Sequence, residues 1–136
     1  MKKYFVILLF AATSLFSCCS DESGSLINQW VLVSYGNESG EVLKEANGYF
    51  YMLAFNSNGT YSGMAYGNKL GGKYRCIANT IKIIDYDMTL VLVEGSDCDK
   101  YFIENLCGDY SYTIINNELK LVSPKGFYFK FRLKQQ

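Results

Sequence analysis

The stretch Phe127-Tyr128-Phe129-Lys130-Phe131-Arg132-Leu133 (FYFKFRL), close to the end of the chain, decides the class of fold. Apolar residues alternate there with tyrosine and basic residues at a period of two, which predicts a half-buried β-strand. The side chains expected in the core are Phe127, Phe129, Phe131 and Leu133, and those expected outside are Tyr128, Lys130, Arg132 and Lys134. An anion site on this basic row is one reading, but we favour a solvated face or a charged edge strand.

Working back along the chain, further segments rich in β-branched and aromatic residues alternate with clusters of turn residues. The expected strands are 27–35, 49–55, a return strand starting at Thr60, 73–77, 80–85, 88–93, 109–115, 118–122 and 127–133. The expected turns are Asn58-Gly59, Asn116-Asn117 and Pro124-Lys125-Gly126. The spacing predicts a mainly β (α+β) fold, a compact and curved antiparallel sheet, barrel-like, of about eight strands.

Residues 97–106 break the strand pattern. Cys98, Phe102 and Leu106 recur there at a spacing of four, which predicts one short amphipathic helix. The pair Ser96 and Asp99 resembles a capping box at its start, and Gly108 supplies a stop.

The composition excludes several classes of function. The chain has 136 residues, no histidine and a formal net charge of zero. Without histidine there is no Ser-His-Asp triad, no Cys-His dyad and no His-ligated zinc. The zero charge argues against a partner nucleic acid, which normally requires a basic patch. We therefore predict a protein that is not an enzyme and that holds no metal and no cofactor.

Residues 1–17 have the layout of a bacterial lipoprotein signal peptide. Two lysines precede an apolar run, and Leu15-Phe16-Ser17 leads into Cys18. This resembles a lipobox in which Cys18 is lipidated, whereas Cys19 fits that role worse. A plain secretion signal and a membrane-anchoring helix are the alternatives, although the apolar run is short for a span.

The chain then divides into three parts. After the signal peptide 1–17, residues 18–26 read as a flexible tether and residues 27–136 as a β-domain. The expected partner is the membrane, reached through the lipid anchor, because several acyl chains together make attachment effectively permanent. The expected location is the bacterial outer membrane, facing the periplasm or the cell surface.

Three of the five cysteines lie in the predicted domain: Cys76, Cys98 and Cys107. Cys98 and Cys107 stand at opposite ends of the predicted helix, about 13 Å apart, too far for a disulfide. Cys76 with Cys98 or Cys107 is the remaining local pairing, and three small buried residues are the alternative.

Two further groups of side chains invite a functional interpretation. The acidic residues between 85 and 104 lack the glycine and final glutamate of a calcium loop, and helix capping or solvation explains them better. The 12 tyrosines suit the stacking of sugars or peptides, but packing between neighbouring strands is the favoured interpretation.

The order of these segments resembles the META-domain family, also called HslJ-like. The matching elements are Trp30-Val31-Leu32, Phe55-x-x-x-Gly59-Thr60-Tyr61-Ser62-Gly63, Asn68-x-x-x-Gly72-x-Tyr74, Ile81-x-Ile83 with Thr89, Asp99-x-x-Phe102-x-x-x-Leu106, and Tyr112 with Leu119 and Leu121. The family's cysteine before the asparagine is Gly67 here, and Asp99 replaces a glutamate. The resemblance covers most of residues 27–136. It implies a curved antiparallel β-structure with one helix in an envelope lipoprotein, and it brings no agreed enzymatic activity with it.

The sequence thus predicts a non-enzymatic, lipid-anchored envelope β-domain with a binding role or an accessory role in envelope stability. The ligand-binding residues are unknown at this stage. The alternative is a lipocalin-like carrier of a small apolar or aromatic ligand, which requires an enclosed cavity of several hundred cubic ångströms inside the barrel.

Overall fold

The fold is an antiparallel β-barrel with one short helix. It is seen in a computed structural model that describes residues 20–21, 24–37, 44–45, 51–89 and 97–136. The strands are β1 (Ser20–Asp21), β2 (Gly24–Ser25), β3 (Gln29–Asn37), β4 (Lys44–Glu45), β5 (Tyr51–Phe55), β6 (Thr60–Ala65), β7 (Asn68–Ile77), β8 (Thr80–Ile83), β9 (Asp87–Met88), β10 (Gly108–Ile115), β11 (Glu118–Val122) and β12 (Phe127–Leu133), and the helix is α1 (Asp97–Asn105).

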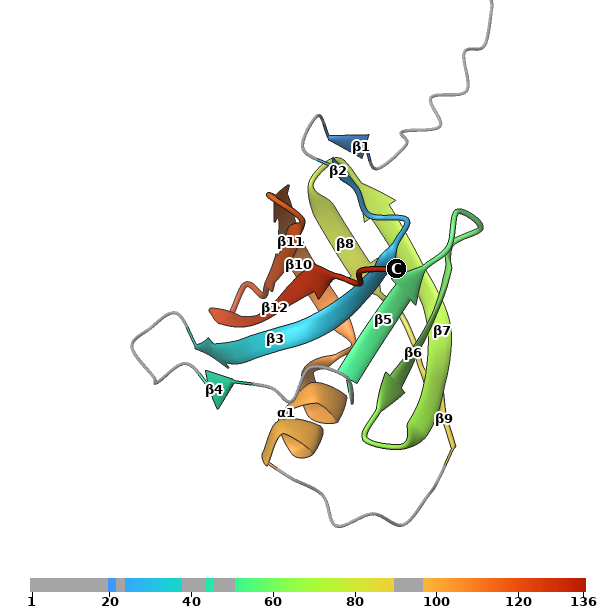
Figure 1. The fold of residues 1–136 in the computed structure, drawn as a ribbon, viewed down its shortest axis with the longest axis vertical. Coiled ribbons are helices and arrows are strands. Elements are labelled where there is room, and N and C mark those ends of the chain that lie inside the picture. Colours follow the sequence, from blue (N-terminus) through green and yellow to red (C-terminus); the bar gives the residue numbers. More distant parts are fainter. Residues whose placement is uncertain (1–19, 22–23, 38–43, 46–50, 90–96) are drawn as a thin grey trace, which may run out of the picture.

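Eight of these strands form the wall of the barrel. Their order is β3, β5, β6, β7, β8, β10, β11 and β12, and each pairs antiparallel with the next. The last strand, β12, returns to pair with β3 and closes the sheet (Figure 1). The prediction of a mainly β, barrel-like fold with one short helix is therefore confirmed.

The alternation in β12 places its side chains largely as predicted. Phe129 and Phe131 are fully buried in the core, while Arg132 is exposed. Tyr128 is different, because only 5% of it is exposed although it lies on the outer face. Closure also removes one interpretation of the basic row: β12 is bonded to β11 and β3 and is not an edge strand.

The predicted turns form where the sequence placed them. Gly59 has a φ of 79°, and Asn116 and Asn117 have φ values of 50° and 62°, as a tight hairpin turn requires. The Asn58 side chain accepts a hydrogen bond from the Thr60 amide at 3.1 Å, which stabilises the first of these turns. One turn was not predicted: Tyr66 and Gly67, with φ values of 40° and 85°, connect β6 to β7.

Strand β7 begins five residues earlier than predicted, at Asn68 rather than Lys73. The glycines at 71 and 72 made this stretch a weak strand candidate. At position 72 the absence of a side chain is required, because a Cβ would collide with the carbonyl oxygen of Asp85. The chain crosses over β7 there, and the Tyr61 hydroxyl donates to the Asp85 carbonyl at 2.8 Å.

Helix α1 lies across the lower end of the barrel in Figure 1. Its predicted apolar face is confirmed, since Cys98, Phe102 and Leu106 are all buried. Two tyrosines fasten it to the wall. The Tyr101 hydroxyl donates to the Gly36 carbonyl at 2.7 Å, and the Tyr110 hydroxyl donates to the carbonyls of Asn105 and Leu106.

The core begins one residue before the predicted domain boundary. Leu26 is fully buried, and its carbonyl accepts a hydrogen bond from the Trp30 indole at 3.0 Å. Just before it, β1 pairs with β2 within the segment predicted to be a tether. The signal peptide, Cys18, Ser96, residues 49–50 of the predicted strand 49–55 and residues 90–93 of the predicted strand 88–93 lie outside the described residues. None of the described helices is long and apolar enough to span a membrane.

Neither local pairing that the sequence left open, Cys76 with Cys98 or Cys76 with Cys107, forms in the structure. Cys76 is disulfide-bonded, whereas Cys98 and Cys107 are both free thiols. Cys98 lies on the apolar face of α1, where it packs in the core as a small buried residue. Cys107 follows the helix and is exposed.

Candidate functional site

The interior of the barrel is filled by side chains. Trp30, Phe129 and Phe131 are at most 1% exposed, and the rings of Phe102 and Phe129 lie 5.5 Å apart. A side chain lining a cavity of several hundred cubic ångströms would expose a measurable part of its surface to it. The packing of these described residues therefore does not favour a lipocalin-like carrier.

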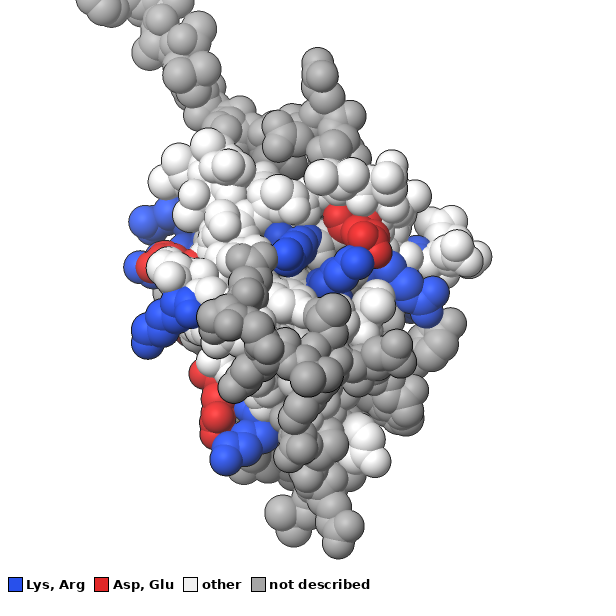
Figure 2. Space-filling view, turned by 90° about the vertical axis from the view of Figure 1, so that its left-hand side faces the viewer, with Lys and Arg blue, Asp and Glu red and all other residues white. Residues whose placement is uncertain are grey.

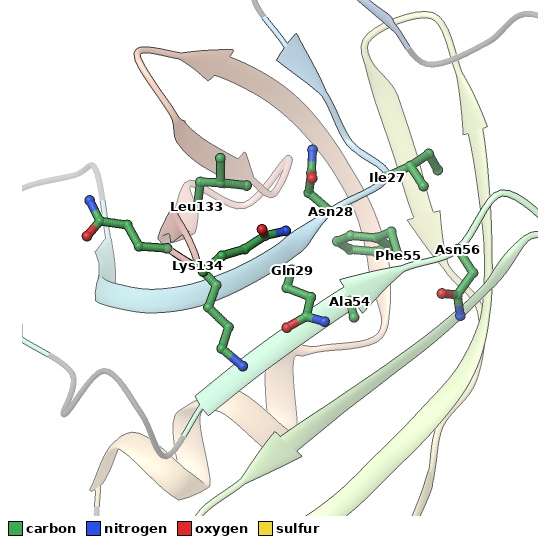
Figure 3. A pocket seen from close by; sticks show the side chains of 10 residues that line it. Ile27, Asn28, Gln29, Ala54, Phe55, Asn56, Leu133 and Lys134 are labelled. Carbon is green, nitrogen blue, oxygen red and sulfur yellow. The ribbon is translucent and has the colours of Figure 1, made fainter.

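One hollow lies on the surface of the barrel. It measures about 720 Å³ and lies between the start of β3, the end of β5 and the C-terminal residues. The C-terminal residues are held there because the Lys134 amide donates to the Gln29 carbonyl at 2.9 Å. Figure 3 shows Gln29 and Lys134 projecting over β5, with Asn56 at its tip. Helix α1 lies at the opposite end of the barrel (Figure 1).

Carboxamide side chains dominate the lining of this hollow. They are Asn28, Gln29, Asn56, Gln135 and Gln136. Each carboxamide offers both a donor and an acceptor. The amide nitrogens of Asn28 and Asn56 are used, since they donate to the Ser25 carbonyl at 2.9 Å and to the Thr60 hydroxyl at 3.2 Å. Those two hydrogen bonds fix the side chains of Asn28 and Asn56 and leave their amide oxygens available as acceptors.

The charge of the hollow is small. Lys134 is the one ionisable side chain among its ten lining residues. Ile27, Ala54 and Leu133 supply apolar surface beside the amides. The lining thus offers hydrogen-bond donors and acceptors, one positive charge and apolar surface.

Tyr61, Tyr110 and Cys107 form a second group of side chains, where β6, β8 and β10 approach the end of α1. All three have raised pKa values. Burial, and secondarily the negative charge of Cys107, raises the pKa of Tyr61 and Tyr110 well above the ordinary value of a tyrosine. Cys107 is an exposed residue whose thiol is only partly shielded from water, and this partial desolvation, followed by the negative charge of Asp85, raises the pKa of the thiol. At neutral pH this thiol is therefore protonated and a poor nucleophile.

The residues considered for function from the sequence are dispersed in the structure. Seven tyrosines belong to the buried set, which confirms packing as their main role: Tyr35, Tyr51, Tyr61, Tyr74, Tyr110, Tyr112 and Tyr128. Within the described part of the chain, no three acidic or cysteine side chains come close enough to hold a metal ion.

The carboxamides of the hollow were not singled out from the sequence. Three separate segments contribute them: residues 28–29, residue 56 and residues 135–136. No spacing rule connects these positions, because they meet only after the barrel closes. Asn28 and Gln29 lie within the predicted strand 27–35, and Asn56 follows the predicted strand 49–55, so none of them stood out as a ligand-binding residue.

Comparison with known proteins supports the fold. No family model and no curated protein matches the chain. Three solved structures do, however. One is a protein from Burkholderia xenovorans, 14% identical with a TM-score of 0.65, covering 81% of this chain and 83% of that one. Another is a DUF4847 family protein from Bacteroides vulgatus, 16% identical with a TM-score of 0.60, covering 81% of this chain and 94% of that one. These likenesses establish the fold alone.

Proposed function

We propose that this chain is a non-enzymatic, lipid-anchored domain of the bacterial envelope that acts by binding a neutral polar ligand in the amide-lined hollow. The observation that carries the proposal is the lining itself, with five carboxamides and one ionisable side chain. The filled barrel interior supports it further, because it leaves the surface as the place for a ligand.

A saccharide is the ligand class that fits this chemistry. Its hydroxyl groups both donate and accept hydrogen bonds, as carboxamides do. Its carbon–hydrogen face would rest on the apolar side of the hollow formed by Ile27, Ala54 and Leu133. The small charge of the hollow favours a neutral sugar over an acidic one.

Titration with a neutral disaccharide of N-acetylglucosamine, followed by amide chemical shifts, tests this binding. We expect saturable shifts at Gln29, Asn56 and the C-terminal residues. Gln29→Ala removes an exposed side-chain carboxamide that makes no hydrogen bond to the described residues. We expect the affinity for the disaccharide to fall by about fivefold. Thr80→Ala, on the exposed side of β8, is the control. Equal affinity in the two variants would show that the hollow is not the site.

The anchor is supported by the signal-like residues 1–17 and by the resemblance to the META-domain family. Metabolic labelling with a palmitate analogue tests it separately from ligand binding. We expect label on the natural chain and none on Cys18→Ala, with Cys107→Ala as the control that retains it. Label persisting in Cys18→Ala would contradict lipidation at that residue.

A further inference from the structure

The outer face of β10, β11, β12 and β3 carries side chains in ordered rows, which follow from the strand registers. Thr113 lies opposite Lys120, Lys120 opposite Lys130, and Lys130 opposite Ser34. Two lysines therefore stand side by side at the centre of the row, with a hydroxyl group beyond each of them. Figure 2 views the molecule from the left-hand side of Figure 1 and shows several Lys and Arg side chains, with Asp and Glu side chains among them.

A direct pair of lysines needs an explanation because like charges opposite each other destabilise a sheet. The row is not at an edge, since β12 is bonded on both sides, so protection against edge pairing does not explain it. Glu118 lies 3.2 Å from Lys130 and compensates part of the charge. Both side chains of that pair are more than one-third exposed, so water screens the attraction between them.

These side chains surround a groove of about 410 Å³. Ser34, Thr113, Lys120, Tyr128 and Lys130 all contribute to its lining. The lining also includes Glu118 and Ile115, so the groove combines two ammonium groups and one carboxylate with three hydroxyl groups from four adjacent strands.

Tyr128 adds an independent observation. It is 95% buried, and its hydroxyl is one of two buried polar atoms, in the described part of the chain, that make no hydrogen bond. Its ring lies across Gly36, where a Cβ would come within 3.3 Å of the hydroxyl oxygen. The Lys120 ammonium lies 5.0 Å from the ring centroid. Leaving this buried hydroxyl without a partner is unfavourable, and a ligand that accepts its hydrogen bond would relieve that cost.

We infer that Lys120, Lys130 and the Tyr128 hydroxyl form a binding site for a phosphate group. Lysines bind phosphate groups as point charges. A phosphate also has enough oxygens to accept from Tyr128, Ser34 and Thr113 together. This site is separate from the amide-lined hollow and does not depend on it.

Titration of the full chain with inorganic phosphate at constant ionic strength tests the site. We expect saturable amide shifts at Ser34, Lys120 and Lys130. The double variant Lys120→Gln/Lys130→Gln should bind at least about tenfold more weakly. The matched control is Lys73→Gln/Lys82→Gln, which removes the same charge from exposed positions of β7 and β8. Equal weakening in the two double variants would overturn the proposal, because general charge would then explain the binding.

Tyr128→Phe separates a ligand role from a packing role, since it removes the hydroxyl and keeps the ring. We expect phosphate affinity to fall by about tenfold while thermal stability is kept or raised. Unchanged affinity would overturn the assignment of the hydroxyl to the site. Melting curves of every variant establish that the barrel remains folded.

Two soluble phosphates distinguish the source of the group. Glucose 6-phosphate represents a phosphate monoester, and glycerophosphoglycerol represents the headgroup of an anionic lipid. Tighter lysine-dependent binding of either one supports the site and identifies its ligand. Absence of saturable binding for both of them and for inorganic phosphate would overturn it.

Discussion

Single residues allow the segment after β8 to cross closely over β7 in the barrel wall. Gly72 lies directly under the backbone of Asp85, and the Lys73 amide donates to the Asp85 side chain at 2.8 Å. The crossing carries the chain from β8 to β9, which pairs with Leu70 and Gly71. A side chain at position 72 would push this crossing away from the barrel wall.

Gly72→Ala is therefore expected to destabilise the fold by about 2–3 kcal/mol, the cost typical of an overpacked site. Urea denaturation measures the change in the free energy of unfolding. Lys73→Ala is the control, because its side chain is exposed and its amide hydrogen bond survives the substitution, so we expect a change within about 0.5 kcal/mol. Equal losses would mean that the close approach is not the cause.

The cysteines give a second prediction at this scale. Cys98 is buried and has a raised pKa, first because of burial, so alkylation of the native protein at neutral pH should miss it. Cys107 is exposed and should react, faster as the pH rises towards its raised pKa. Cys76 should react only after reduction, because it is disulfide-bonded. Mass mapping of alkylated peptides checks all three, and label on Cys76 without reduction would contradict the disulfide.

Residue patterns predicted local features better than pairings. The turn at Asn58-Gly59 was predictable because both residue types favour the required conformation. The turn at Tyr66 was not, since a tyrosine at a φ of 40° contradicts local preference and depends on the two strands it joins. The state of Cys76 was not predictable in the same way: the helical spacing placed Cys98 on the buried face, but no local pattern showed that Cys76 is disulfide-bonded while Cys98 and Cys107 stay free.

Among the elements, α1 is the one whose contribution is easiest to isolate. Phe102 projects from it into the barrel, fully buried and 5.5 Å from the rings of both Tyr51 and Phe129. The spacing of Cys98, Phe102 and Leu106 was sufficient to predict both the helix and its buried face. It did not show that the helix covers one end of a barrel, because that depends on distant strands.

Phe102→Ala should lower the free energy of unfolding by about 3–5 kcal/mol, since it removes a large buried ring and leaves a cavity. Glu104→Ala on the exposed side of the same helix is the control, with an expected change within about 0.5 kcal/mol. Chemical denaturation measures both variants. A small loss in Phe102→Ala would show that the helix is dispensable for the barrel.

At the scale of the whole molecule, closure between β12 and β3 determines what each surface can do. The alternation in residues 127–133 predicted the strand and its two faces. No local pattern shows that this strand pairs with β3, which lies almost one hundred residues earlier in the chain. Both candidate sites depend on this pairing. The amide-lined hollow joins the start of β3 to the C-terminal residues, and the groove joins β3 to β12.

The whole fold should also be sensitive to alkaline pH, because several buried groups hold their protons more tightly than in the unfolded chain. Burial is the first cause of the raised pKa of Tyr61, Tyr110 and Cys98. Above about pH 9–10 the unfolded chain loses these protons while the folded chain retains them, so stability falls as the pH rises.

We expect a loss of about 1 kcal/mol for each of Tyr61 and Tyr110 between pH 9 and pH 11. Thermal melting across this range measures it. Tyr61→Phe/Tyr110→Phe should flatten the pH dependence, although its stability at pH 8 falls because the hydrogen bonds to Asp85, Asn105 and Leu106 are lost. Tyr86→Phe, at an exposed position, should keep the full dependence. If the double variant lost stability as steeply as the natural chain, these two buried hydroxyls would not be the groups that set the alkaline limit of the barrel.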